Sequence, residues 1–586
     1  MRIHAIKFTS VCTGVHAVML FAVMASCITI AGAQDIDRYR PSLPANNKCV
    51  TSLPAAPITA IAESTEILVP ELKGILILDN VELLQVPASG VDGLKIHPAA
   101  DLTVARKDCF SQALKPYLGQ PVSIHSLNEL AQNIVYVYRD CKQPAVDVQI
   151  PPGQEISGGV IQVVITESRV GAVKYRGNCH FDACVLQQQN WLKAGELIYE
   201  PCLHQELLWY NKNPFRSVGV HYEPGCQHGT TDIVYTVNDR DPVRYYVGYE
   251  DSGTRLTGLE RLLFGVNFGN LLGTESQLSY QYSTDANPGV YTGVHSVLYQ
   301  KPIFDNRDTV SLFGSWTDID SSIAGTNVDA TGWQISGRYH HTLCEDACQV
   351  DQFYFGFDTK GTDSDLDFGG QTVIGQQVEV VNLMTGFSSE QTFDDGYTNY
   401  SLDVFASPGN LLPNNRSRDF KQLRAGSKAA YVYARGNIER LYQVNCHSDF
   451  YVKLTGQIAN DRLLQTEQLG FGGYNSIRGY DMRTLNGDNG YILNCEYRSR
   501  PLVRCSDGQQ TSLTMLAFAD AGQQFNWSSP AGEHDNELLA SAGVGLRYTL
   551  DQNCSIRFDY GVPLTDIGGV QNNSNGRIHL GALLSY

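Results

Sequence analysis

From Pro242 to its end, the chain consists of stretches of about ten residues in which apolar side chains alternate with polar or small ones. The alternation is regular at residues 542–550 and 554–560, and again at residues 578–586. A two-residue period is typical of strands that present one face to an apolar phase and the other to a polar one. After Ala33 there is no run of roughly 18 or more apolar residues. Such a chain can cross a membrane only as a closed β-barrel.

These stretches predict a mainly β protein in which residues 243–586 form an antiparallel transmembrane β-barrel. At about 21 residues for each strand and its loop, the segment accommodates roughly sixteen strands, and bacterial barrels have an even number. The 31 tyrosines agree with this prediction, because barrels carry girdles of aromatic rings at both membrane interfaces. A soluble β-sandwich gives the same alternation and is the alternative fold.

The amino terminus predicts export. A basic start is followed by an apolar stretch at residues 11–30 and by the small residues Ala31-Gly32-Ala33. This order is typical of a secretory signal peptide, here residues 1–33, which would be cleaved before Gln34. Two alternatives remain, because the stretch is long enough for an uncleaved anchor and Cys27 lies in a possible lipid-attachment box.

Two α+β modules are predicted between the signal peptide and the barrel. Residues 34–65 contain four prolines without a hydrophobic period, which indicates an extended linker. Residues 66–168 and 169–242 then show the same order of strand, two helices and two strands, so we predict two tandem copies of one module. In the first copy the expected strands are 74–78, 145–150 and 160–166 and the helices 109–118 and 126–141; in the second the strands are 171–175, 217–223 and 231–237 and the helices 181–192 and 203–211.

Several motifs occur in the order found in one known family. Residues 118–123 and 150–165, and then residues 207–214 and 223–242, are similar to two successive periplasmic POTRA modules. Residues 247–273 resemble the first strands of the barrel that follows them. The whole mature chain thus resembles the two-partner secretion transporters, also called haemolysin secretion/activation proteins. The resemblance implies a 16-stranded barrel preceded by two POTRA modules.

Two barrel motifs are the most specific part of this resemblance. Residues 472–480, which end in Ile477-Arg478-Gly479-Tyr480, resemble the V-R-G-Y/F loop that folds back into the barrel lumen in the family. Residues 518–522 fit its F-x-D-x-G strand motif through Phe518, Asp520 and Gly522. The resemblance assigns Arg478 and Asp520 to a lumen-loop latch that the other motif residues, Gly479, Tyr480, Phe518 and Gly522, support.

The direction in which Asp520 points can be predicted without the family. Residues 513, 515, 517 and 519 are Leu, Met, Ala and Ala, so one face of this strand is apolar. A carboxylate is costly against lipid, so Asp520 on the opposite face must point into the barrel. Without the family, the alternative is that residues 477–480 are only a loop apex and that Asp520 is a solvated lumen residue.

Two features depart from the family pattern. The segment before the first module is short and rich in proline, so we do not expect a plug helix to fill the lumen. The chain ends in Tyr586 where the family usually has Phe. An aromatic carboxy-terminal strand still resembles the signal that the outer-membrane barrel assembly machinery reads.

Thirteen of the 15 cysteines follow the signal peptide, and in an exported chain they are candidates for disulfide bonds. We predict a Cys344–Cys348 bridge and a Cys109–Cys141 bridge that brackets the helices of the first module. The odd count leaves one cysteine over, for which Cys49 in the linker is the candidate. Strand counting back from Tyr586 places six cysteines at the periplasmic rim of the barrel, namely Cys344, Cys348, Cys446, Cys495, Cys505 and Cys554.

Sequence motifs for catalysis are missing. The chain contains no G-x-S-x-G, no G-x-x-x-x-G-K-[ST] and no H-E-x-x-H motif, so we predict neither an enzyme nor a cofactor. Two weak metal patterns remain. The first is His340, His341, Cys344 and Cys348, whose spacing matches no usual zinc knuckle and favours a disulfide-closed turn. The second is Asp363, Asp365 and Asp367, which we interpret as a solvated external loop, because the downstream glutamate of a calcium loop is missing.

Charge and resemblance together indicate the function. The net charge of −18 argues against a nucleic-acid partner. The resemblance implies a bacterial outer-membrane transporter with its modules in the periplasm, embedded in lipid and inserted by the assembly machinery. It would take up a secreted partner polypeptide through module strand edges and pass it through the barrel without nucleotide. The alternatives are an assembly factor for other barrels, and a passive solute pore, which would need no modules.

Overall fold

The computed structural model divides the chain into two compact units, Asn46–Asp241 and Met1–Ala45 with Pro242–Tyr586. None of the described helices is long and apolar enough to cross a membrane. The predicted signal peptide, Cys27, Cys49 and most of the predicted linker lie outside the described residues. Those described are residues 40–44, 64–86, 88, 90–253, 259–286, 290–303, 307–323, 326–346, 348–368, 371–506, 509–526, 535–567 and 576–586.

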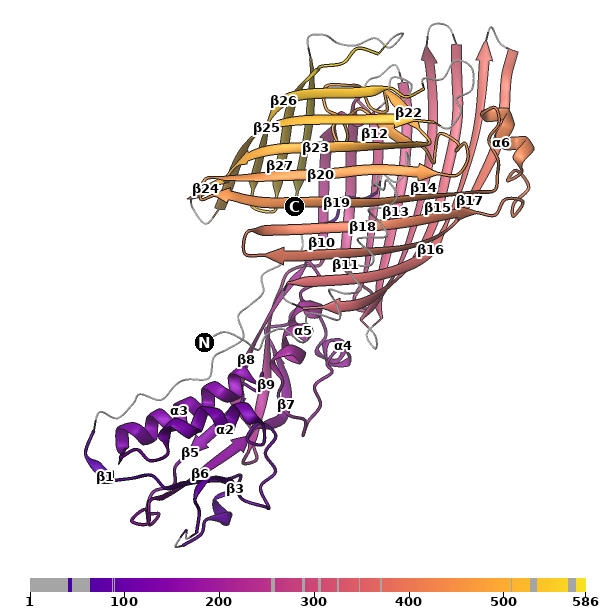
Figure 1. Ribbon diagram of the computed structural model, residues 1–586. Helices are drawn as coiled ribbons and strands as arrows, with labels where there is room; N and C mark the ends of the chain where they lie inside the picture. Colours follow the sequence, from indigo (N-terminus) through magenta and orange to yellow (C-terminus); the bar gives the residue numbers. More distant parts are fainter. Residues whose placement is uncertain are drawn as a thin grey trace. The chain divides into compact units, whose positions relative to one another are not determined.

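The first module is a four-stranded sheet with two helices on one face (Figure 1). The long helix begins at Ser123, whose side chain accepts a hydrogen bond from the Ser126 N–H at 3.2 Å. The Ser126 hydroxyl in turn accepts from the Ser123 N–H, so the two residues form a capping box. Ile75, Ile134 and Tyr138 fill the core between helix and sheet. The sheet has the order β3-β2-β6-β5, with β2 (Gly74–Leu78), β3 (Gly93–Ile96), β5 (Val146–Gln149) and β6 (Val160–Glu167), the helices are α2 (Asp108–Leu114) and α3 (Ile124–Asp140), and β1 (Ile67–Val69) pairs with β4 (Val122–Ser123).

The second module repeats this connectivity. Its first strand lies parallel to its last, and its middle strand lies antiparallel to its last, as β2, β6 and β5 do in the first module. The buried Glu206 carboxylate accepts the Leu192 N–H at 2.9 Å and the Tyr235 hydroxyl. The sheet has the order β7-β9-β8, with β7 (Arg169–Arg176), β8 (Arg216–Pro224) and β9 (Thr230–Asp239), and the helices are α4 (Ala183–Gln188) and α5 (Glu200–Tyr210).

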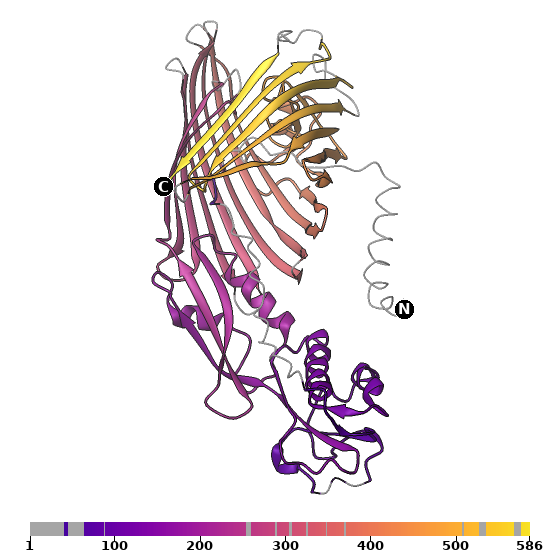
Figure 2. The same cartoon turned by 90° about the vertical axis from the view of Figure 1, so that its left-hand side faces the viewer.

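The second unit contains a closed antiparallel barrel (Figures 1 and 2). Because β23 and β24 both pair with β25 and are interrupted only around Pro501, they count as one strand. The predicted sixteen strands are therefore confirmed. They are β10 (Val243–Glu250), β11 (Arg261–Leu271), β12 (Ser276–Asp285), β13 (Val290–Ile303), β14 (Asp308–Ile323), β15 (Thr326–Glu345), β16 (Gln349–Phe368), β17 (Gln371–Phe393), β18 (Gly396–Ser407), β19 (Tyr431–Asn445), β20 (Ser448–Ala459), β23 (Asn489–Ser499) with β24 (Leu502–Ser506), β25 (Gln509–Phe525), β26 (Leu538–Leu550), β27 (Cys554–Pro563) and β28 (Arg577–Ser585).

The two faces of the barrel wall differ as the alternation predicts. On β25, Met515 is 48% exposed on the outer face, whereas Asp520 on the inner face is 2% exposed. One prediction about a loop is wrong. Asp363, Asp365 and Asp367 belong to β16, which runs to Phe368. Their every-second-residue spacing is itself a strand pattern, and the missing calcium-loop glutamate was no evidence for a loop.

Five of the six barrel cysteines lie at the end of the barrel that contains Tyr586, which we call the terminal rim. Successive strands run in opposite directions, so every second connection returns to this rim. The prediction for Cys495 is wrong, because this residue pairs with Val452 and Ala519 within β23. Cys495 and Cys505 belong to one strand, formed by β23 and β24, and with Cys505 at the rim, Cys495 ten positions earlier cannot lie there too. The five rim cysteines are Cys344, Cys348, Cys446, Cys505 and Cys554.

The two predicted disulfides stay predictions. The Sγ atoms of Cys109 and Cys141 lie 3.6 Å apart, at α2 and at the end of α3. Cys344 and Cys348 flank the turn between β15 and β16 and are not bonded to each other.

We expect both bridges in protein purified from an oxidising compartment. Peptide mapping under non-reducing conditions should recover 109–141 and 344–348 as linked pairs. The first bridge closes a loop with a sequence separation of 32, so its loss through Cys109→Ser should cost on the order of 3–4 kcal/mol of module stability. Recovery of all four cysteines as alkylated thiols from non-reduced protein would contradict the prediction.

Candidate functional site

The connection between β20 and β23, residues 460–488, folds into the barrel as a loop with a short hairpin stem. The stem pairs β21 (Leu469–Phe471) with β22 (Leu485–Gly487). At the tip, Gly479 has a φ of 94°, a backbone conformation that favours glycine. A Cβ there would also lie 2.9 Å from the Gly561 carbonyl carbon on β27. Glycine therefore lets the tip lie directly against the barrel wall.

Apolar side chains fix this lumen loop against the inner face. Ile477 is fully buried, and Tyr480 is 3% exposed. Both pack with Ile492 of β23 and Leu539 of β26. The Tyr480 hydroxyl lies 2.8 Å from the Thr565 carbonyl oxygen. The burial explains why a large apolar residue stands at position 477, between polar neighbours.

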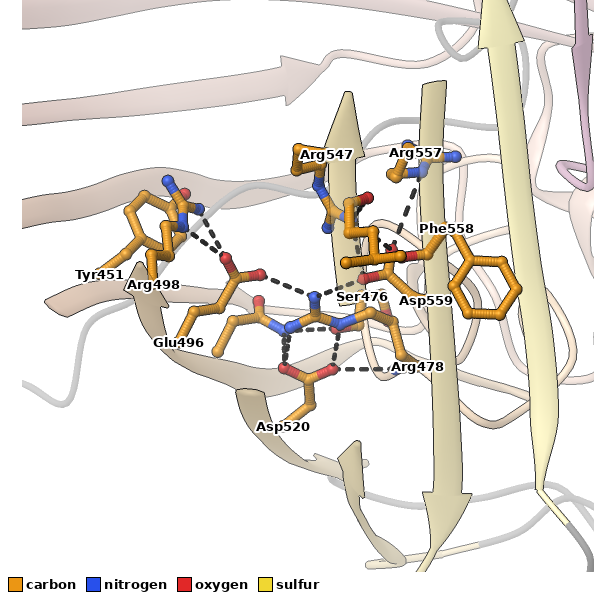
Figure 3. Close-up of polar contacts among 12 residues, drawn as sticks. Tyr451, Ser476, Arg478, Glu496, Arg498, Asp520, Arg547, Arg557, Phe558 and Asp559 are labelled. Atoms are coloured by element: carbon orange, nitrogen blue, oxygen red, sulfur yellow. Dashed lines mark hydrogen bonds and ion pairs between the residues drawn. The ribbon is translucent and has the colours of Figure 1, made fainter. Parts of the chain in front are cut away.

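The predicted latch residues meet in the structure (Figure 3). The Arg478 guanidinium donates to both Asp520 carboxylate oxygens at 2.8 Å, from Nε and from Nη2. The Arg478 backbone N–H donates to the same carboxylate at 3.1 Å, and Asn494 Nδ2 donates to it at 2.8 Å. Both charged side chains are almost fully buried. This is a bidentate pair, the geometry that favours arginine over lysine.

The supporting motif residues also have visible roles. The Phe518 ring lies under the Arg478 guanidinium, 3.6 Å from ring centroid to Cζ, which allows a cation–π interaction. A Cβ on Gly522 would lie 2.8 Å from Ile477 Cδ1, so glycine there leaves room for the loop. The F-x-D-x-G pattern thus provides a ring, a carboxylate and a space on one face of β25.

Two further carboxylates complete the site, and sequence reasoning missed both. Arg478 Nη1 donates to Glu496 of β23 at 2.7 Å and lies 3.5 Å from Asp559 of β27. Arg498 pairs with Glu496 and Arg547 pairs with Asp559, at 2.7 and 2.9 Å. The alternation could have indicated Asp559, because a charged side chain in a membrane strand must point inward. Which of the inward charges meet depends on register, which the sequence does not provide.

The loop tip also contacts the two strands that close the barrel. The Gly479 N–H donates to His579 Nε2 of β28 at 3.1 Å. The other ring nitrogen of His579 lies 2.5 Å from Asp251, just after β10. Because Nε2 accepts, this geometry implies that Nδ1 carries the hydrogen. Arg577 of β28 pairs with Asp481 of the loop.

A short amino-terminal segment, residues 40–44, lies along the same inner wall. The Ser42 N–H donates to the Tyr246 hydroxyl at 3.0 Å, and Asn267 Nδ2 donates to the Ser42 carbonyl oxygen at 3.0 Å. The Arg40 guanidinium lies 5.1 Å from the centroid of the Phe313 ring. The described part of this segment is not helical. The expectation about a plug helix falls on residues outside the described part of the chain.

The possible zinc residues are not gathered together. His340 and His341 are consecutive on β15 and therefore point to opposite faces. The His340 ring centroid lies 5.2 Å from that of Tyr354, whereas His341 Nδ1 lies 2.8 Å from Asp308. Among the described residues no group of three or more possible ligands could hold a metal ion.

The comparisons with known proteins agree with this architecture. Residues 229–548 match the model for haemolysin secretion/activation protein ShlB/FhaC/HecB, and residues 99–168 match the POTRA domain of the ShlB type. Heme/hemopexin transporter protein HuxB of Haemophilus influenzae (strain 86-028NP) is 23% identical over 474 residues, 78% of this chain and 80% of HuxB. The structure of CdiB from Escherichia coli has a TM-score of 0.67 at 20% identity and covers 91% of this chain and 94% of its own. BamA from Haemophilus ducreyi lacking POTRA domains 1–3 has a TM-score of 0.51 at 14% identity, over 83% of this chain and 98% of its own.

Replacing Arg478 should free the loop tip. Arg478→Ala leaves the buried carboxylates without their shared cation, a loss on the order of 3–5 kcal/mol that lumen water would partly relieve. Protease cleavage within residues 460–488, measured on folded barrels in membranes, should become at least about tenfold faster. The cleavage rate of Arg478→Lys should lie between those of the unaltered protein and Arg478→Ala, because lysine keeps the charge but cannot form the bidentate pair.

The matched control is Arg504→Ala, at an exposed position of β24. Its lumen loop should be cleaved at the same rate as that of the unaltered protein. Unchanged protection of the loop in Arg478→Ala would show that the ion cluster does not hold the tip.

Proposed function

Because the chain belongs to the haemolysin secretion/activation protein family ShlB/FhaC/HecB, a family of outer-membrane two-partner secretion transporters, we propose that it exports one partner polypeptide. The partner is captured in the periplasm by the two modules and passes through the barrel to the cell surface or the medium. No nucleotide is consumed, and folding of the partner outside the cell provides the direction.

The lumen loop is the observation that supports transport over simple diffusion. A passive pore keeps its lumen open, whereas here a loop with a buried ion cluster occupies the inner face of β23, β25 and β27. A conduit closed in this way must change conformation before a polypeptide passes. Assembly of other barrels is the alternative from the wider fold, and the BamA likeness supports only the fold.

An open strand edge on β8 is the proposed contact for the partner. The backbone groups of Val218 are already engaged, because its N–H donates to Asn211 Oδ1 at 2.7 Å and its carbonyl oxygen accepts from the Asn211 amide at 3.0 Å. Alternate residues of a strand direct their backbone groups to the same side, so Val220 and Tyr222 face the same edge. β8 is an outer strand of its sheet. Pro224 ends the edge because it has no N–H.

Deletion of both modules should distinguish export of a partner polypeptide from barrel assembly and from passive diffusion through a pore. A chain that lacks residues 66–240 should still insert as a heat-modifiable barrel but should export no partner. The measurement is the amount of partner in the medium of a heterologous host that expresses both proteins, with unrelated barrels quantified in the same membranes. Export that survives the deletion would count against module capture, and a general loss of other barrels without loss of export would favour an assembly factor.

A proline at the open edge is a finer test of capture. Val220→Pro removes an edge N–H without removing a bond to β9, so the module should fold while partner binding falls about tenfold, the equivalent of one net hydrogen bond. Val220→Ala, which truncates the side chain but keeps the N–H, is the matched control. Equal export by both variants would place the contact elsewhere, for example on β3 or β5 of the first module.

A further inference from the structure

A second buried ion pair holds the lumen loop just before its stem. Glu467, which precedes β21, is fully buried, and its Oε1 lies 2.9 Å from Lys360 Nζ of β16. Its other oxygen accepts from Asn382 Nδ2 at 2.8 Å and from the Tyr433 hydroxyl at 2.7 Å. Lys360 is 2% exposed. A buried glutamate with a cation and two neutral donors is fully satisfied, as burial requires.

The two ion pairs lie on different parts of the barrel wall. Lys360 is on β16, Asn382 on β17 and Tyr433 on β19, whereas the Arg478 cluster is on β23, β25 and β27. Strand order places β16 and β27 eight strands apart in the ring of sixteen, whereas the nearest strands of the two sets, β19 and β23, are separated only by β20. The loop is therefore attached to two separate arcs of the barrel wall, β16–β19 near its stem and β23–β27 at its tip.

Apolar packing and a further ion pair near the stem add to the attachment made by Lys360 and Glu467. Leu463 and Leu464 of the loop are buried with Phe420 of α6 (Ser417–Leu423) and with Tyr431. Arg424, just after α6, pairs with Asp488 at the end of the loop at 2.5 Å. The loop that carries α6 and the lumen loop thus form one packed body. Release of the tip alone would leave this body in place.

We propose that Lys360 and Glu467 are positioning residues that form a second lock, so that the lumen opens widely only when both the stem and the tip are released. Each lock alone keeps the loop in the lumen, because each attaches it to its own arc of the wall. The two locks act in parallel, so their effects on the open channel are strongly non-additive. For its role in export the inference rests on the proposed function, but the channel property does not.

Single-channel conductance of the purified full chain in planar bilayers tests this directly. Arg478→Ala alone and Glu467→Gln alone should each raise the mean open conductance less than twofold. The double variant should raise it at least about fivefold. A triple variant, Arg478→Ala with Lys360→Glu and Glu467→Lys, restores the ion pair in reverse. Its conductance should fall from that of the double variant back toward that of Arg478→Ala alone.

A matched control is an exposed ion pair between the α6 loop and the lumen loop. Lys428 pairs with Asp461 at 2.6 Å, but its side chain is 59% exposed, so Lys428→Met should not add to the effect of Arg478→Ala. Heat-modifiable migration of every variant verifies that the barrel has folded. A double variant that conducts no more than the larger single variant, or a reversed pair that does not rescue, would overturn the proposal. Because no partner is present, this outcome is independent of whether the chain exports a polypeptide.

Discussion

In a bilayer every backbone N–H and C=O must find its partner within the protein, and this constraint determines the rest of the structure. The chain satisfies it with a ladder that returns from β28 to β10. That last pairing comprises five residue pairs, whereas β16 and β17 share twenty. Closure also determines on which face charged side chains lie, because the outer face of the barrel is in contact with lipid. Ionised side chains of the strands therefore collect in the lumen, where they can only pair with each other or with what enters.

The lumen loop is held in place by these inward-facing charges. Asp520, Glu496 and Asp559 come from three strands, and none of them could be buried alone without a large desolvation cost. Arg478, together with Arg498 and Arg547, compensates them. The loop is consequently part of the electrostatic balance of the wall. Moving it out requires that water, or a polar segment of another chain, replaces the guanidinium.

Much of the fold could be predicted, because a period of two residues is a local property. The alternation predicted the barrel and its strand number, and parity alone placed Asp520 inside. The contact between Glu467 and Lys360 could not be predicted, because it joins residues separated by 107 positions and depends on the strand order and register. Cys495 was misplaced although the turn at Cys505 was predicted correctly, because both residues belong to one strand and only one of them can lie at its end. The resemblance to the family identified Arg478, but only geometry shows what else holds the loop.

The modules meet the opposite requirement, since a sheet that captures a strand must leave an edge unpaired. An unpaired edge also invites aggregation. On β8 the exposed part is confined between the Asn211 amide and Pro224, so only Val220 and Tyr222 offer backbone groups. At about 0.5–1.5 kcal/mol for each net hydrogen bond, so short an edge can bind a passing strand only weakly. Weak capture agrees with transport, because a transporter that bound its partner tightly in the periplasm could not release it into the barrel.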